Sequence, residues 1–141
     1  MLMTATQAQS AQAIATFVSN FHHDLTRWFS GADEGEATWN ALVNACPDNM
    51  TLIYPCGAQL SGRAFLEELA SSKRHNGDFV ASATEIRVLH AEKDLGVVAH
   101  QELQQGAKAS QRSNLRSALA LVRRGEQGWH WDYIQETGMK S

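Results

Sequence analysis

Charged and hydrogen-bonding side chains stand at alternating positions in the second half of the chain, a pattern typical of β-strands. In "NLRSALALVRR", residues 114–124, the neighbours of Arg116 on its own side of a strand are Ala118 and Ala120. A long cation among alanines has room to lie inward, where a carboxylate of Glu102 or of a ligand would pair with it. The alternative is a cross-strand ion pair on the outer face of the sheet, which would stabilise the protein little.

The closing segment "GEQGWHWDYIQET", residues 125–137, places Trp129, Trp131 and Tyr133 at every second position. Alternate residues of a strand share one face, so these three rings either pack in the core or line a cavity. Tyr133 and Gln135 lie nearer the end of the strand. They are therefore the better candidates for hydrogen bonds to a ligand.

The histidines do not show the spacing of a metal site. His22 and His23 are adjacent on a predicted helix, where they would point about 100° apart and could not easily share one ion. A usable helical pair would need i, i+4 spacing. The remaining candidates lie on three different predicted strands, and nothing in their spacing requires any two to meet: His90, His100 and His130. We therefore expect no bound metal and no cofactor.

The composition argues against several classes of partner. The formal net charge of −3 disfavours binding to nucleic acid. The opening "MLMTATQAQSAQ" lacks the features of a secretory signal, and no apolar run is long enough to cross a bilayer. Cys46 and Cys56 stand ten residues apart with no second pair, so they do not form a zinc motif. We expect free thiols in a cytoplasmic protein.

The 141 residues fit a single domain, residues 1–141, with about residues 1–7 as a flexible N-terminus. Apolar residues recur at helical spacing over residues 8–30, and Gly31 would end this helix. Trp28 on its apolar face would pack the helix against a sheet and could also wall a cavity. Shorter helices are predicted over residues 36–46 and from a cap at Ser61 to Gly77, with a β-rich run at 50–55 between them.

After Gly77 the pattern changes to alternation, which predicts strands over residues 79–91, 96–105 and 112–123, and a fourth in the closing segment. Helices followed by long hairpin-linked strands indicate an α+β fold with helices on one face of an antiparallel sheet. Such long strands twist and curl, so the sheet would form a cone with an interior. The pattern leaves open whether Arg116 or Leu115 faces that interior, because a change of one residue inverts the face.

The order of these elements and several local motifs resemble the nuclear transport factor 2-like superfamily, whose fold is also called cystatin-like. The similar stretches are "FHHDLTRWFSG", "MTLIYPCGAQLSGRAFLEEL", "HQELQ", "NLRSALALVRR" and "GWHWDYIQET", and the SnoaL-like and calmodulin-dependent-kinase association-domain-like members are the most similar. The resemblance implies a strongly curved cone with a pocket at its open end, and a homodimer that forms through the outer face of the sheet. It implies no single activity, because this fold carries many.

Some members of this superfamily are enzymes, including isomerases, dehydratases and hydrolases. Ketosteroid isomerase needs a carboxylate base near the proline turn after the first strand, where this chain has "LIY", residues 52–54. The phenol of Tyr54 is a poor base at neutral pH. The residue sets of the dehydratase and the hydrolase cannot be traced in this sequence.

The leading hypothesis is a domain that binds a small organic molecule bearing a carboxylate, with no catalysis expected. Its candidate ligand-binding residues are Arg116, Tyr54, Tyr133, Gln135, Glu102 and Trp28. Two alternatives stay open. One is a cofactor-free isomerase, dehydratase or hydrolase, which would require an acid or base inside the cavity beside Arg116, namely Glu102, His100 or Asp132. The other is a protein-association module that uses the outer face of the sheet.

Overall fold

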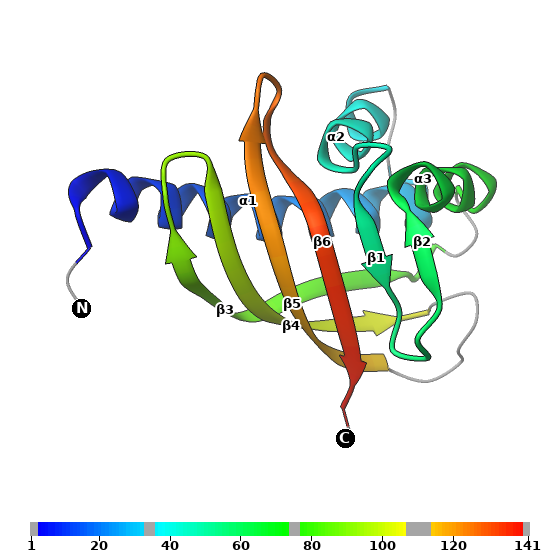
Figure 1. Ribbon diagram of the computed structural model, residues 1–141. Helices are drawn as coiled ribbons and strands as arrows, with labels where there is room; N and C mark the ends of the chain where they lie inside the picture. The colour runs from blue at the N-terminus through cyan, green and yellow to red at the C-terminus, as the bar shows by residue number, and fades with distance from the viewer. Residues whose placement is uncertain (1–2, 33–35, 74–76, 107–113, 140–141) are drawn as a thin grey trace.

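The computed structural model describes residues 3–32, 36–73, 77–106 and 114–139 (Figure 1). The elements within these ranges are, in chain order, α1 (Ala5–Ser30), α2 (Ala37–Ala45), β1 (Thr51–Ile53), β2 (Gln59–Ser61), α3 (Gly62–Ser71), β3 (Val80–Ala91), β4 (Leu95–Gln105), β5 (Asn114–Gly125) and β6 (Gly128–Gly138). This is the predicted order of helices and strands, with β2 as an addition. Residues 112 and 113, predicted to begin a strand, lie outside the described residues.

Helix α1 begins at Ala5, three residues before the start that apolar spacing predicted. The cause is a capping box, in which the Thr4 hydroxyl accepts from the Gln7 amide at 3.1 Å and the Gln7 side chain accepts from the Thr4 amide at 2.9 Å. The helix ends at Gly31, as predicted, in the left-handed conformation with φ of 80°. Within the described residues, no helix has both the length and the apolar character needed to cross a membrane.

The six described strands form one sheet in the order β2-β1-β6-β5-β4-β3. All neighbours are antiparallel except β1 and β6, which pair in parallel, so the sheet is mixed and not purely antiparallel as predicted. The β3–β4 pairing contains two register shifts, and Glu85 there has a positive φ of 52°. Bulges of this kind bend a strand and increase its twist. Figure 1 shows the resulting curved sheet, with α1 running across it and α2 and α3 near one end of α1.

The core lies between α1 and the inner face of β4, β5 and β6. Ile14 and Val18 on α1 are fully buried, as are Val98 and Val122 on the sheet. Gly96 on β4 lets α1 lie close to the sheet, because a Cβ atom at this position would lie 2.3 Å from the Cδ1 atom of Ile14. The α+β fold with helices packed on one face of a curved sheet is therefore confirmed.

Trp28, near the C-terminal end of α1, packs this helix against α2 and α3. Its indole Nε1 donates to the carbonyl of Leu69 on α3 at 2.6 Å, and its ring lies 4.7 Å from that of Trp39 on α2. These contacts show Trp28 packing against the helices α2 and α3. The side chain is buried and is not one of those that line the cavity described below.

A bulge in β6 decides which of its residues face inward. Leu121 on β5 pairs with Tyr133 and Val122 pairs with Trp131, so Asp132 is an extra residue in β6. Before the bulge, Trp131 is 1% exposed in the core, and after it Ile134 is buried in its turn. The strict alternation predicted for Trp129, Trp131 and Tyr133 is therefore wrong at Tyr133, because the bulge moves this residue to the outer face.

Candidate functional site

A cavity of about 860 Å³ lies between the inner face of the sheet, α1 and α3. Much of its wall is apolar, with side chains from α1, α3, β1 and the start of the β3 segment: Phe21, Leu25, Phe29, Leu52, Phe65 and Phe79. The charged and hydrogen-bonding groups come mainly from β4, β5 and β6. This size and this mixture of an apolar wall with a few polar groups are typical of sites for small molecules.

Arg116 faces the inside of the sheet. It is 8% exposed and shares its face with the buried Ala118 and Ala120, whereas Leu119 between them is 51% exposed on the other face. The question that the sequence left open is thus settled in favour of an inward Arg116. Its Nη1 donates to a carboxylate oxygen of Glu136 on β6 at 2.8 Å. Glu102, the expected protein partner, is opposite Arg116 in the strand register but makes its hydrogen bonds elsewhere.

Glu136 is a buried carboxyl group whose pKa is raised above its ordinary value. Burial raises its pKa, the negative charge of Glu102 raises it further, and Arg116 opposes both effects only in part. The resulting pKa is about 7. At neutral pH such a carboxyl group is present in both its protonated and its ionised form, whereas an exposed glutamate is almost fully ionised.

Glu102 on β4 forms a buried ion pair with His22 on α1. The Nε2 atom of His22 lies 2.6 Å from Glu102 Oε1, and the two residues are 2% and 5% exposed. The other ring nitrogen, Nδ1, donates to the carbonyl of Val18 at 2.7 Å. Burial alone would lower the pKa of His22 and raise that of Glu102, but their mutual hydrogen bond and charge reverse both shifts. Both ring nitrogens of His22 face oxygen acceptors, the Val18 carbonyl and Glu102 Oε1, as a protonated imidazole beside an ionised carboxylate requires.

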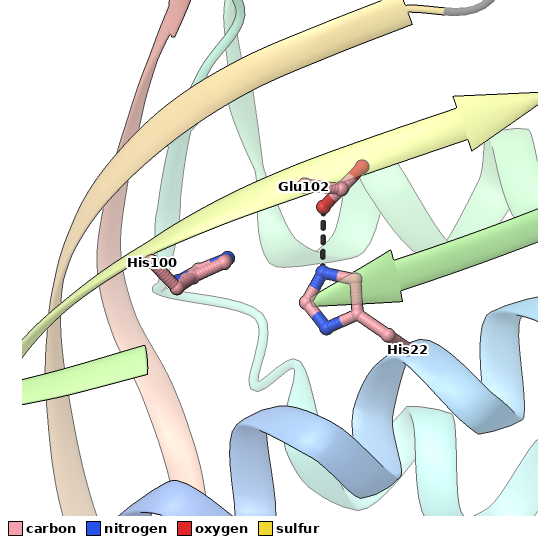
Figure 2. A group of neighbouring side chains, drawn as sticks. All are labelled: His22, His100 and Glu102. Atoms are coloured by element: carbon pink, nitrogen blue, oxygen red, sulfur yellow. Dashed lines mark hydrogen bonds and ion pairs between the residues drawn. The ribbon is translucent and has the colours of Figure 1, made fainter. Parts of the chain in front are cut away.

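His100 lies two residues before Glu102 on the same face of β4. Its ring centroid is 5.2 Å from that of His22, in an edge-to-face arrangement. Figure 2 shows one of its ring nitrogens directed toward the His22–Glu102 pair. Burial and, second, the positive charge of His22 lower the pKa of His100 to about 4, so the imidazole is neutral at pH 7.

Tyr54 lines the cavity as a hydrogen-bond donor. Its hydroxyl donates to a carboxylate oxygen of Glu68 on α3 at 3.1 Å. Burial, followed by the negative charge of Glu68, raises the pKa of Tyr54 above its ordinary value. The phenol is thus even less suited to act as a base than the sequence argument assumed.

Arg116, Glu102 and Tyr54 line the cavity, and three other predicted site residues do not. Tyr133 and Gln135 lie past the bulge on the outer face, where the Tyr133 hydroxyl donates to the side-chain oxygen of Gln135 at 3.0 Å. Trp28 packs between helices instead. Asp132, which the enzyme hypothesis placed inside, pairs with the exposed Arg123 at 3.1 Å. Glu102 and His100, the two other groups named by that hypothesis, do lie in the cavity wall.

Sequence reasoning missed His22 and Glu136. His22 follows Val18 by four residues and precedes Leu25 by three, so helical spacing alone places it on the apolar face. His23 is exposed, as the argument about adjacent helical residues requires. Glu136 could not have been found in this way, because the bulge at Asp132 hides its orientation.

Three buried side-chain atoms lack a hydrogen-bond partner among the described residues. They are His100 Nδ1, Arg116 Nε and Trp131 Nε1, and all three belong to residues that line the cavity. Buried polar groups are usually paired, since each unpaired one costs about 1–3 kcal/mol. Their concentration around one cavity indicates hydrogen-bonding capacity that the fold itself does not use.

Comparison with known proteins identifies the fold. Neither a search of protein-family models nor a search of curated proteins finds a match. Solved structures do match, including an NTF2-like protein of unknown function from Pseudomonas aeruginosa with a TM-score of 0.78 and 19% identity, over 91% of this chain and 99% of that one.

Two further structures show the functional breadth of this likeness. One is the kinase association domain of C. elegans CaMKII, with a TM-score of 0.71 and 12% identity over 95% of this chain and 99% of that one. The other is a provisionally assigned scytalone dehydratase from Novosphingobium aromaticivorans, with a TM-score of 0.72 and 12% identity over 98% of this chain and 89% of that one. At these identities the likeness concerns the fold alone. The chain has the nuclear transport factor 2-like, or cystatin-like, fold that its sequence motifs resemble.

Proposed function

We propose that the protein binds a small, mainly apolar organic molecule whose polar end is a carboxylate. The observation that carries this proposal is the cavity of about 860 Å³, in whose wall three buried polar atoms have no partner among the described residues. The apolar wall would supply most of the affinity, since burying apolar surface stabilises by about 25 cal/mol per Å². Arg116 and Tyr54 would orient the polar end.

The charge balance of the cavity favours an anionic ligand. Arg116 is held by Glu136, whose pKa of about 7 allows it to take up a proton at little cost near neutral pH. Once Glu136 is neutral, the guanidinium can pair with a ligand carboxylate through charge-assisted hydrogen bonds, which are the strong ones. Glu136 therefore acts in this proposal as a partner that the ligand displaces.

A matched pair of probes tests this proposal, namely 1-naphthoate and the neutral 1-naphthamide, with binding measured by calorimetry in the presence of a chelator. The carboxylate is expected to bind about 10- to 100-fold more tightly, because a hydrogen bond to a charged group contributes about 1.5–3 kcal/mol. In R116M the two probes are expected to bind equally. The exposed Arg123 offers the control R123M, which is expected to keep the preference.

The variant E136Q provides a second reading if R116M does not fold. It removes the negative charge that competes for Arg116, so naphthoate is expected to bind more tightly than to the wild type. Equal binding of both probes to the wild type, or the same preference in R116M and R123M, would contradict the proposal. Native mass spectrometry of freshly purified protein would reveal a ligand retained from the host.

Proton-transfer catalysis is the second candidate function, and the split between two carboxylates favours it. Glu102 has a lowered pKa and Glu136 a pKa of about 7, in one cavity. Pairs of groups whose environments separate their pKa values are typical of acid–base sites. A cofactor-free isomerase or dehydratase would use Glu136 to move the proton. Deuterium uptake from D2O into a bound carbonyl compound, lost in E136Q, would support it, and its absence would favour binding alone.

We also propose a homodimer that forms through an outer apolar patch, defined as Val97, Ala99 and Leu103 of β4 with Leu115, Leu119 and Leu121 of β5. These residues pair directly across the two strands, and Leu119 is 51% exposed. The other five are half-buried, and the polar pair Gln101 and Ser117 lies among them on the same face. Apolar residues gathered on an outer face are typical of protein interfaces. The likeness to an association domain is consistent with self-association but concerns the fold.

Sedimentation equilibrium tests the dimer. The wild type is expected to dimerise. L119E is expected to weaken dimerisation about 30-fold or more, because it places a charge at the most exposed residue of the patch and the few residues that dominate an interface each contribute about 2 kcal/mol or more. L89E is the control, since Leu89 on β3 is 54% exposed but lies outside the patch. A monomeric wild type, or an L119E protein that dimerises like L89E, would refute this interface.

A further inference from the structure

Three potential metal ligands converge in the cavity wall, and we call them the His22–His100–Glu102 cluster. Their candidate ligand atoms all lie within 4.8 Å of one another, and the three residues are 2%, 4% and 5% exposed. Figure 2 shows them approaching one point from two elements, α1 and β4. Bonds of about 2.0–2.2 Å to a tetrahedral metal ion hold neighbouring ligand atoms about 3.3–3.6 Å apart. Shifts of about 1 Å in these side chains would therefore let all three atoms reach a shared ion, with His22 and Glu102 moving slightly apart.

The hydrogen bonds around the cluster orient the ligands as in known metal sites. His22 Nδ1 donates to the Val18 carbonyl at 2.7 Å, which leaves Nε2 as the nitrogen that faces Glu102. The side-chain amide of Gln104 donates to the other carboxylate oxygen of Glu102. Ligating histidines usually donate their second ring N–H to a carbonyl or carboxylate in this way, and ligating carboxylates are themselves hydrogen-bonded.

The surroundings of the cluster are apolar on two sides and open on another. The ring of Phe21 lies edge-on to His22 at 5.6 Å, and the ring of Trp131 lies 6.1 Å from that of His100. All three members of the cluster also line the cavity, so an ion among them would keep a coordination position open to a ligand. Three protein ligands with one open position are typical of catalytic rather than structural sites.

A purely structural ion pair explains only part of this arrangement. His22 and Glu102 satisfy each other, but His100 makes no described hydrogen bond at Nδ1 and lies beside the protonated His22. A shared metal ion gives all three residues one role. It would replace the proton on His22 Nε2, and the His22–Glu102 ion pair would be the metal-free form of the site.

We propose that the His22–His100–Glu102 cluster binds one divalent first-row transition metal ion, such as Zn²⁺ or Co²⁺. Two imidazoles and one carboxylate are the donors that these ions prefer, whereas Mg²⁺ and Ca²⁺ prefer oxygen ligands alone. The bound ion and Glu102 together carry one positive charge, and the Arg116–Glu136 pair is neutral when both residues are ionised. The open position would therefore attract an anion. The metal proposal does not depend on the proposed organic ligand.

The test uses tag-free protein stripped with a chelator and then titrated with Zn²⁺, Co²⁺ and Mg²⁺. Calorimetry is expected to show one Zn²⁺ per chain, Co²⁺ is expected to give ligand-field absorption bands, and Mg²⁺ is expected not to bind. H100N and E102Q are each expected to weaken Zn²⁺ binding about 100-fold or more, since even outer partners contribute 10- to 100-fold. H23N is the matched control, because His23 is adjacent to His22 but exposed.

Two results would overturn the proposal. One is the absence of Zn²⁺ and Co²⁺ binding by folded wild-type protein. The other is Zn²⁺ affinity in H100N and E102Q equal to that of H23N, which would place the ion elsewhere. Circular dichroism in chelator shows whether each variant is folded, and the two variants change different ligands, so the failure of one to fold leaves the other decisive. The naphthoate titration is done in chelator, so either proposal can fail without the other.

Discussion

Replacing His22 by leucine is expected to lower the free energy of unfolding by about 3–5 kcal/mol, because it leaves the buried Glu102 carboxylate without its partner. Glu102 is 5% exposed and accepts its hydrogen bond from His22 at 2.6 Å. Its remaining partner, Gln104, is a neutral amide. The measurement is urea unfolding at pH 7 in the presence of a chelator, so that metal binding does not contribute.

Two comparisons separate this effect from a simple loss of packing. H23L, at the exposed neighbouring position, is expected to change stability by less than about 0.5 kcal/mol. The double variant H22L/E102L is expected to recover most of the loss, because no buried charge remains and apolar replacements of buried ion pairs are often neutral. A double variant less stable than H22L would show that the pair does not act through charge. If H22L is unfolded, refolding of the double variant decides the question.

The second large effect is a pH dependence that belongs to Glu136. Its pKa is about 7 in the folded protein, against 4.5 as the ordinary value, so the folded state holds this proton more tightly. Between these two values the unfolded chain has lost the proton and the folded chain has not. Stability therefore falls as the pH rises from 4.5 to 7, and the loss is complete above that range. At about 1.4 kcal/mol for each pKa unit, the change is ~3 kcal/mol.

The variant E136Q isolates this contribution. The free energy of unfolding is measured by urea unfolding from pH 4.5 to 8 for both proteins. The value for E136Q minus the value for the wild type is expected to rise by ~3 kcal/mol over this range, because only the wild type loses stability. The charged and titratable groups around Glu136 are unchanged in both proteins: Arg116, Glu102, His22 and Tyr54. For the control E126Q, in the exposed turn between β5 and β6, the difference in free energy of unfolding from the wild type is expected to stay the same across this pH range. A flat difference for E136Q as well would mean that Glu136 titrates normally.

The elements that follow regular periodicity could be predicted from the sequence. The apolar spacing of α1 and the alternation in β3, β4 and β5 place each element to within three residues. The strand β2 has only three residues, too few to show a period. The parallel pairing of β1 with β6 was missed because it joins segments far apart in the chain, Thr51–Ile53 and residues 133–135, and local pattern carries no information about such contacts.

The site was harder to predict than the fold for the same reason. The alanine neighbours of Arg116 made its inward direction one of the two alternatives that the sequence left open, and the structure decides between them. Its partner Glu136 depends on the bulge in β6, and the His22–Glu102 pair joins residues 80 positions apart. Alternation predicted Tyr133 and Gln135 as lining residues, because it assumes that every residue of a strand has a partner opposite.

The extra residue at Asp132 decides which charged groups reach the hollow of the sheet. If Asp132 were paired opposite a residue of β5, as in a regular ladder, Tyr133 and Gln135 would turn toward the hollow and Glu136 would turn to solvent, leaving Arg116 without its partner. Deleting Asp132 would instead make the ladder regular and keep Ile134 and Glu136 inward, because Trp131 and Tyr133 would then be neighbours on opposite faces. The ionic lining of the hollow therefore survives loss of the extra residue, but not its incorporation into the ladder.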